Sequence, residues 1–73
     1  MHIKVMTRAV PGGDPEPASF AIGTRELQVD EVLDRWPGRL CDYFKIAASD
    51  GARYILRHAT EEGEWELVWF SAD

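Results

Sequence analysis

Cysteine and histidine are the side chains that most readily hold a metal ion or act in nucleophilic catalysis, and this chain has Cys41, His2 and His58. No Cys-x-x-Cys or His-x-x-x-His pair occurs, so the spacing of tetrahedral zinc ligands is absent from the sequence. Cys41 and His58 could form a nucleophile–base dyad, but such a dyad would lack an orienting third group and a pocket. A small apolar thiol beside Leu40 explains Cys41 more simply. We therefore predict no metal, no cofactor and no catalytic residue.

Carboxylate pairs and glycine-rich segments give no better indication of an enzyme. The pairs Asp30-Glu31 and Glu61-Glu62 are adjacent in sequence, whereas glycosidase-like chemistry needs two carboxyl groups held across a cleft. The segment 11–14, Pro-Gly-Gly-Asp, has neither the spacing nor the lysine of a phosphate-binding loop. The sequence therefore predicts a non-enzymatic protein.

The charge distribution bears on which partners are expected. The 73 residues carry 13 acidic and 8 basic side chains, a net charge of -5, which argues against binding to a phosphate backbone. Residues 37–60 are locally basic, but residues 61–73 add five acids and no base. We therefore expect a protein partner of unknown identity rather than nucleic acid. The side chains that we select as a candidate interaction surface are Arg35, Trp36, Tyr43, Arg53 and Arg57.

Length and hydropathy limit the remaining possibilities. A chain of 73 residues forms one small domain, residues 1–73, with a thin core. No stretch approaches the ~20 apolar residues of a membrane span, and the first residues lack the apolar region of a signal peptide. The single cysteine fits a reducing compartment. We expect a cytoplasmic protein without membrane contact, either a monomer or a weak dimer.

Breaks in the sequence divide the chain into short pieces that favour strands over helices. The breaks are a Pro- and Gly-rich loop at 11–17, Pro37-Gly38, Asp50-Gly51 and residues 61–63. In the first piece Ile3, Val5, Thr7 and Ala9 alternate with polar residues, which is the period of a half-buried strand.

The segments on either side of Asp50-Gly51 predict a hairpin with a defined register. A loop of residues 49–51 pairs Ala48 with Ala52 and requires Gly51 to adopt the left-handed region. Only this register places Phe44, Ile46, Tyr54 and Leu56 together on one face. That face comprises Phe44, Ile46, Ala48, Ala52, Tyr54 and Leu56.

The last strand extends the same face. A loop of residues 60–63 pairs Ala59 with Glu64, and the partners that follow are His58 with Trp65, Leu56 with Leu67, Tyr54 with Trp69 and, on the outer face, Arg57 with Glu66. Together with the preceding hairpin, this predicts the structural residues Gly51, Phe44, Ile46, Tyr54, Leu56, Trp65, Leu67 and Trp69.

The segment 27–36 is ambiguous from its residues alone. Val29, Val32, Leu33 and Trp36 fit a helical spacing, whereas an alternating strand would place Glu31 inward unless a bulge intervenes. As a bent strand over 26–36, it would bring Leu27, Val29 and Leu33 to the core. Trp36 would then cover one end of the barrel, or alternatively serve as an exposed anchor for a partner.

Two stretches resemble known proteins. They are residues 20–36, ending in Glu31-Val32-Leu33-Asp34-Arg35-Trp36, and the hairpin segments 42–46, 50–51, 54–57 and 65–67. Together they resemble a small bacterial domain family of unknown function with an EVLDRW motif. The hairpin half is similar to the C-terminal tail of Y-family-polymerase-like factors of bacterial mutagenesis cassettes. The resemblance implies a bent strand over 26–36 and a context in DNA repair or translesion synthesis.

These observations combine into one expectation of fold and function. We predict an all-β domain, a small antiparallel meander curled into an SH3-like barrel. We expect a non-enzymatic protein-interaction module, with an accessory role in DNA repair or translesion synthesis as the alternative.

Overall fold

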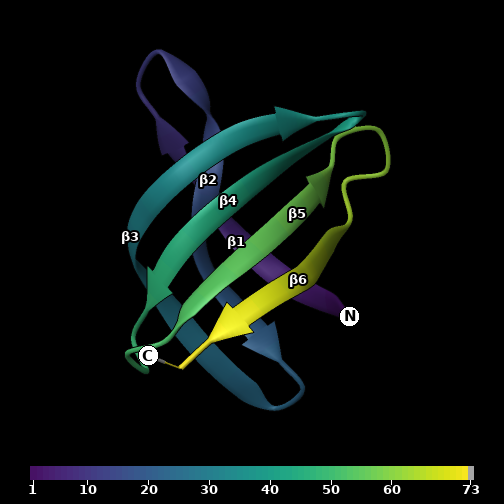
Figure 1. The fold of residues 1–73 in the computed structure, drawn as a ribbon. Helices are drawn as coiled ribbons and strands as arrows, with labels where there is room; N and C mark the ends of the chain where they lie inside the picture. The colour runs from purple at the N-terminus through teal and green to yellow at the C-terminus, as the bar shows by residue number, and fades with distance from the viewer. Residues whose placement is uncertain (73) are drawn as a thin grey trace.

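Six antiparallel strands form a closed barrel in the computed structural model, which describes residues 1–72. Each strand pairs with its neighbour in the chain, and β1 also pairs with β6 (Figure 1). The predicted all-β fold, a small antiparallel meander closed into an SH3-like barrel, is confirmed. The strands are β1 (His2–Val10), β2 (Gly13–Ile22), β3 (Arg25–Gly38), β4 (Cys41–Ala48), β5 (Arg53–Ala59) and β6 (Trp65–Ser71).

The β4–β5 hairpin has the register predicted from its apolar pattern. The Ala48 amide donates to the Ala52 carbonyl over 2.9 Å, and Phe44 lies opposite Leu56. Gly51 has a φ of 84°, as the three-residue turn requires. The Asp50 carboxylate accepts a hydrogen bond from the Ala52 amide at 3.0 Å, which fixes the turn further.

Replacing Gly51 by valine is expected to destabilise the protein by about 1–2 kcal/mol. A Cβ at this position meets nothing within 4 Å, so the cost arises from the positive φ and not from a clash. Chemical denaturation measures the change. Gly51→Asn is the control, because asparagine tolerates a positive φ and this variant should lose much less stability. Equal losses for the two variants would contradict the argument.

The segment with ambiguous spacing is a strand, as predicted. β3 bends from a pairing with β2 to a pairing with β4, and register shifts follow Val29 and Val32. Leu27 and Val29 are buried as expected. The prediction for Leu33 is wrong: it occupies the second bulge and is 39% exposed, and Val32 packs against the core instead.

A bulge also overturns the predicted position of Trp69. The β5–β6 pairing begins as expected, with His58 opposite Trp65 and Leu56 opposite Leu67. The register then shifts at Val68, so Phe70 lies opposite Tyr54 and Trp69 lies opposite Ile55. The extra residue turns Trp69 to the outer face, where 42% of it is exposed.

The predicted loop at 11–17 is shorter than expected. Only Pro11 and Gly12 form the turn, and β2 includes both Pro15 and Pro17. The pairing of β2 with β3 starts at Ser19, so these prolines lie in the half of β2 that pairs with β1. A strand edge tolerates proline because no ladder bond is lost there.

In β1 the predicted alternation holds for its first half only. Ile3 and Val5 are half-buried and pack against the core. Thr7 and Ala9 are exposed, because register shifts after Met6 and after Arg8 interrupt the alternation.

The core lies inside the barrel and draws side chains from five strands. Buried residues of the hairpin meet Phe20 of β2, and the Phe20 ring contacts the edge of the Tyr54 ring at 5.1 Å. The core members are Phe20, Leu27, Val29, Phe44, Ile46, Ala48, Ala52, Tyr54, Leu56 and Trp65. Leu67 is half-buried and packs against them, so of the hydrophobic structural residues predicted from the sequence only Trp69 lies outside the core and its immediate contacts, while Gly51 serves the turn.

Candidate interaction surface

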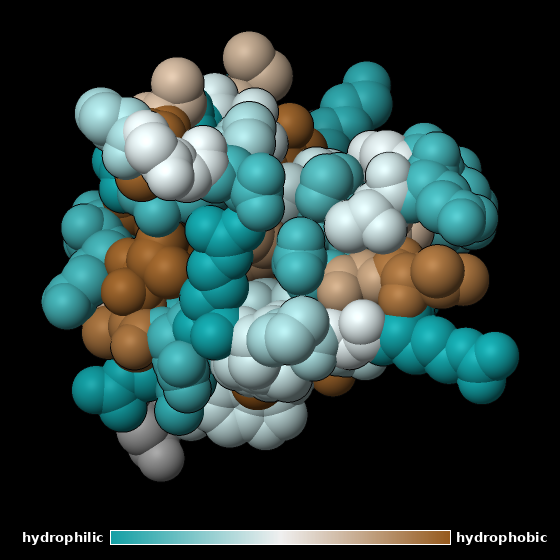
Figure 2. Space-filling model, turned by 90° about the horizontal axis from the view of Figure 1, so that it is seen from above, coloured by the Kyte–Doolittle hydropathy of each residue, from teal (hydrophilic) through white to brown (hydrophobic). Residues whose placement is uncertain are grey.

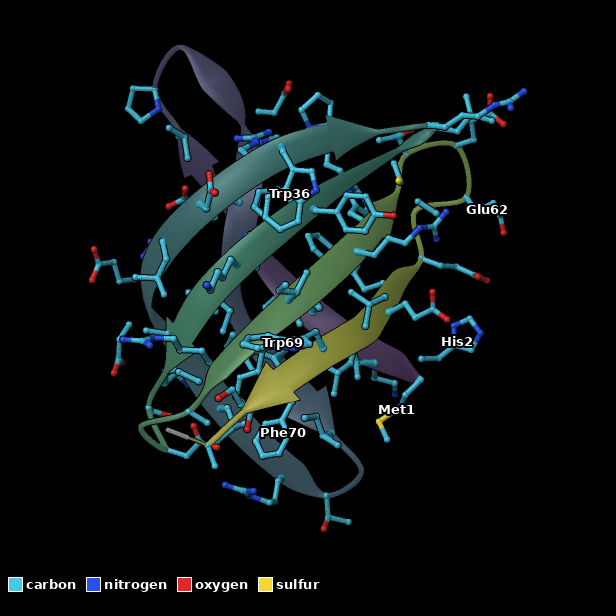
Figure 3. The ribbon with its side chains drawn as sticks, viewed as in Figure 1. Met1, His2, Trp36, Glu62, Trp69 and Phe70 are labelled. Atoms are coloured by element: carbon cyan, nitrogen blue, oxygen red, sulfur yellow. The ribbon has the colours of Figure 1, made fainter. Side chains whose placement is uncertain are left out.

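The outer side of the sheet formed by β3, β4, β5 and β6 gathers most of the residues selected from the sequence. One row across the four strands consists of Trp36, Tyr43, Arg57 and Glu66. The next consists of Asp34, Lys45, Ile55 and Trp69. Trp36 and Trp69 both lie on the side of the sheet that faces the viewer in Figure 3. We call these two rows, together with Arg53, the outer face.

Trp36 and Tyr43 form a stacked pair on this face. Their ring centroids are 5.4 Å apart and their planes differ by 13°. Gly38 makes room for the pair, since a Cβ on it would come within 2.6 Å of both the Tyr43 ring and the Cys41 Sγ atom. The absence of a side chain at Gly38 therefore determines where the Tyr43 ring lies.

Replacing Gly38 by alanine is expected to cost about 1–2 kcal/mol and to disrupt the stack, because the Tyr43 ring or the backbone must move. Denaturation measures the cost, and the near-ultraviolet circular dichroism of the aromatic rings reports the displacement. Gly13→Ala is a matched control: it also lies in a strand, and its added Cβ meets only Val10 at 3.6 Å. A Gly38→Ala protein with unchanged stability and spectrum would contradict this account.

Arg57 lies in the middle of the first row. Its Nη1 atom is 3.8 Å from Oε1 of Glu66, which confirms the predicted pair. The neighbouring Cys41 sulfur, when ionised, and the Tyr43 hydroxyl group raise the pKa of Arg57 above its ordinary value. An arginine is charged at any physiological pH, and at 3.8 Å its ion pair is loose enough for another carboxylate to replace Glu66.

Lys45 and Trp69 are members of the outer face that sequence reasoning did not select. The Lys45 Nζ atom lies 5.6 Å from the centroid of the Trp69 ring, within the range of a cation–π contact. The alternation of Tyr43 and Lys45 already places Lys45 outward, so it could have been found. Trp69 could not, because only the bulge at Val68 brings it to this face.

Arg35 was selected from the sequence but does not belong to the outer face. It lies opposite Phe44, on the inner side, and its guanidinium carbon is 4.9 Å from the Phe44 ring centroid. Its Nη2 atom also lies 3.6 Å from the Asp14 carboxylate. Arg35 therefore covers the inner aromatic residues at this end of the barrel, the position that we predicted for Trp36.

Replacing Trp36 by alanine is expected to cost about 1–2 kcal/mol, less than the ~3–5 kcal/mol of a fully buried tryptophan, because the ring is half-buried and stacks on one neighbour. Thermal melting of the single variant measures the loss. Trp65→Ala is the comparison, since Trp65 is only 8% exposed and should lose clearly more. A Trp36→Ala loss as large as that of Trp65→Ala would place Trp36 in the core after all.

The arrangement does not favour the thiol–histidine dyad. Cys41 pairs with Ala59 and His58 pairs with Asp42, so the two side chains point to opposite sides of the sheet. Cys41 is buried, and the His58 ring stacks on Trp65 with centroids 4.3 Å apart. Within residues 1–72 no three His, Cys, Asp or Glu side chains gather in a metal-binding cluster. The same part of the chain contains no helix with the length and hydrophobicity to cross a membrane.

The hollows of the barrel lie away from the outer face. One, of about 620 Å³, lies at the seam between residues 2–6 and 63–65. Another, of about 260 Å³, lies at the barrel end near Asp42, His58 and Trp65. From above, hydrophobic side chains appear as separate patches among hydrophilic ones (Figure 2).

The comparisons with known proteins give no independent assignment. No protein-family model, curated protein or solved structure matches this chain. The geometry and charge of the outer face are therefore the features of the molecule that bear on its function.

Proposed function

We propose that this protein is a small, non-enzymatic, cytoplasmic protein-interaction module, and that it binds its partner through the outer face. The observation that carries this proposal is the position of Trp36, Tyr43 and Trp69, three aromatic side chains from three strands on the outside of a closed barrel. Trp69 is 42% exposed, and the neighbouring Val68 is 45% exposed.

The barrel does not need these rings to complete its interior. Its core is filled by Phe20, Phe44, Tyr54 and their aliphatic neighbours. Burying apolar surface is favourable by about 25 cal/mol per Å², so a tryptophan left accessible represents stabilisation that an interface can still gain. Tryptophan, tyrosine and arginine are the residue types that most often anchor protein interfaces. The outer face combines all three.

A pull-down with tagged protein tests the proposal. The variant Trp36→Ala/Trp69→Ser removes both accessible tryptophans, and Met6→Ser removes a residue of β1 that is 69% exposed. We expect a protein partner, identified by mass spectrometry, that the native chain and Met6→Ser retain and the double variant loses. Thermal melting must show that the double variant remains folded at the assay temperature. A bound set that is the same for all three proteins would refute the proposal.

An accessory role in DNA repair or translesion synthesis is the alternative that the resemblance of residues 20–70 supports. It is compatible with protein binding, but a direct contact with DNA would require affinity for phosphates. The net charge of -5 leads us to expect no micromolar binding to single- or double-stranded DNA at physiological salt. Fluorescence anisotropy with labelled oligonucleotides measures this, and micromolar binding would favour the alternative.

A further inference from the structure

Positive charge is concentrated in the middle of the outer face. The outward residues of β4 and β5 include Lys45, Arg53 and Arg57 and no acidic side chain. We call these three residues the cationic strip. Within residues 1–72 the acidic side chains lie off the strip, and the acids that border it on this face come from the neighbouring strands β3 and β6. The protein as a whole has a net charge of -5, yet these three cations lie together. Such a strip is electrostatically complementary to a negatively charged ligand.

Each cation of the strip is accessible to a partner. Arg53 is exposed, and Lys45 lies beside the accessible Trp69 ring. The Arg57 guanidinium group is 3.8 Å from the Glu66 carboxylate, which is a long distance for an ion pair. The Glu66 carboxylate is also 3.7 Å from the N-terminal ammonium group. A carboxylate of a partner can therefore pair with Arg57 while Glu66 keeps a cation next to it.

We infer that the partner presents an acidic peptide segment in which carboxylates alternate with apolar side chains, an inference that rests on the proposed function. Its carboxylates pair with Lys45, Arg53 and Arg57, and its apolar side chains contact Trp69 and the Trp36–Tyr43 stack. Alternation fits because cations and apolar side chains alternate along the outward sides of the two central strands, with Tyr43 and then Lys45 on β4, and Arg53, Ile55 and Arg57 in turn on β5.

The acids that border the strip favour a peptide over a nucleic acid. Asp34 and Glu31 lie outward on β3, and Glu66 lies outward on β6. Neighbouring strands are only ~4.8 Å apart, so these carboxylates lie within the ~8–10 Å Debye length of any anion on the strip. A short peptide can place its few charges between them, whereas a continuous run of phosphates extends over them.

Anisotropy titrations with synthetic peptides test the inference. The probe is a short fluorescein-labelled peptide in which Glu alternates with Leu, and the comparison peptides carry Gln or Lys in place of Glu. We expect the Glu peptide to bind about tenfold more tightly than the Gln peptide, and its affinity to fall as salt is raised. The Lys peptide should not bind measurably.

Charge-reversal variants locate the binding. Lys45→Glu/Arg53→Glu should weaken binding of the Glu peptide by about tenfold or more, whereas Lys4→Glu, a reversal on exposed β1, should change it by less than about twofold. If the double reversal does not fold, the same peptide titration is carried out with the glutamine variants Lys45→Gln and Arg53→Gln. Equal losses for Lys4→Glu and for reversals in the strip would indicate a general charge effect and overturn the inference.

The remaining outcomes separate this inference from the proposal on which it rests. Equal binding of the Glu and Gln peptides, together with a captured partner that depends on Trp36 and Trp69, would overturn the acidic segment but leave the interaction module intact. If the Glu and Gln peptides bind equally and no captured partner depends on Trp36 and Trp69, both the acidic segment and the interaction module are overturned. Tighter binding of an oligothymidylate than of the Glu peptide, abolished by Lys45→Glu/Arg53→Glu, would reassign the strip to nucleic acid.

Discussion

Replacing Phe44 by alanine is expected to remove a large fraction of the free energy of unfolding of the protein. The Phe44 side chain is 1% exposed, and its ring contacts Trp65 with centroids 5.6 Å apart and lies under the Arg35 guanidinium group. Truncating a buried phenylalanine costs about 3–5 kcal/mol. At 0.05–0.15 kcal/mol per residue, the whole domain is stabilised by only about 4–11 kcal/mol. The loss is thus a large fraction of the total, and urea denaturation measures it.

Phe70→Ala is the control for this experiment, because Phe70 is 54% exposed and packs on Tyr54 with a centroid distance of 5.3 Å. Its loss should be about 1 kcal/mol or less. Similar denaturation midpoints for the two variants would show that Phe44 is not the centre of the core.

The stability of the protein is expected to fall steeply between about pH 10 and pH 12. The Tyr54 hydroxyl group donates a 2.6 Å hydrogen bond to Oδ2 of Asp50, and burial together with this carboxylate raises the pKa of Tyr54 from 10.0 to about 12. A raised pKa stabilises the folded state below the unfolded value and loses this contribution as the pH approaches the folded value. Two pKa units correspond to a loss on the order of 3 kcal/mol.

Tyr54→Phe separates this effect from general alkaline unfolding. The variant lacks the titrating hydroxyl group, so the difference in denaturation midpoint between the native protein and the variant should shrink across this pH range. Asp50 has the opposite pH dependence, because its pKa is lowered, mainly by the same hydrogen bond. That contribution is present above its ordinary pKa of 3.8 and is lost as the pH falls further. A constant midpoint difference from neutral pH to pH 12 would contradict the assignment.

Local sequence signals predicted the part of the fold that turns and alternation determine. Asp50-Gly51 specified a turn, and the apolar pattern on both sides allowed only the register with Ala48 opposite Ala52. The same reasoning placed Trp65 opposite His58 and Arg57 opposite Glu66. Each conclusion depended on residues close together in the chain, where one slip of register would turn every side chain to the wrong face.

Bulges account for most of what the sequence did not reveal. One residue inserted near Asp30, one at Leu33 and one at Val68 each turn the side chains beyond them to the other side of the sheet. Their positions depend on how a closed barrel must bend, and nothing in the local residue types marks them. For the same reason the sequence indicated Trp69 for the core, and the structure places it on the outer face. Arg35 differs: the two bulges of β3 cancel, so it shares the inner side with Leu27 and Val29, and it was its charge that suggested the surface.

The way in which the barrel closes determines the order in which it comes apart. Adjacent strands are joined through turns of two to five residues, so their contacts form at a small entropic cost. Only the pairing of β1 with β6 joins the two ends of the chain, through His2 with Glu66 and Ile3 with Trp65 and the 2.8 Å bond from the Leu67 amide to the Met1 carbonyl. Slow, long-range contacts of this kind form late in folding and contribute little to its nucleus. We therefore expect β1 to separate from β6 first during unfolding, while the hairpin around Phe44 keeps its pairing longer.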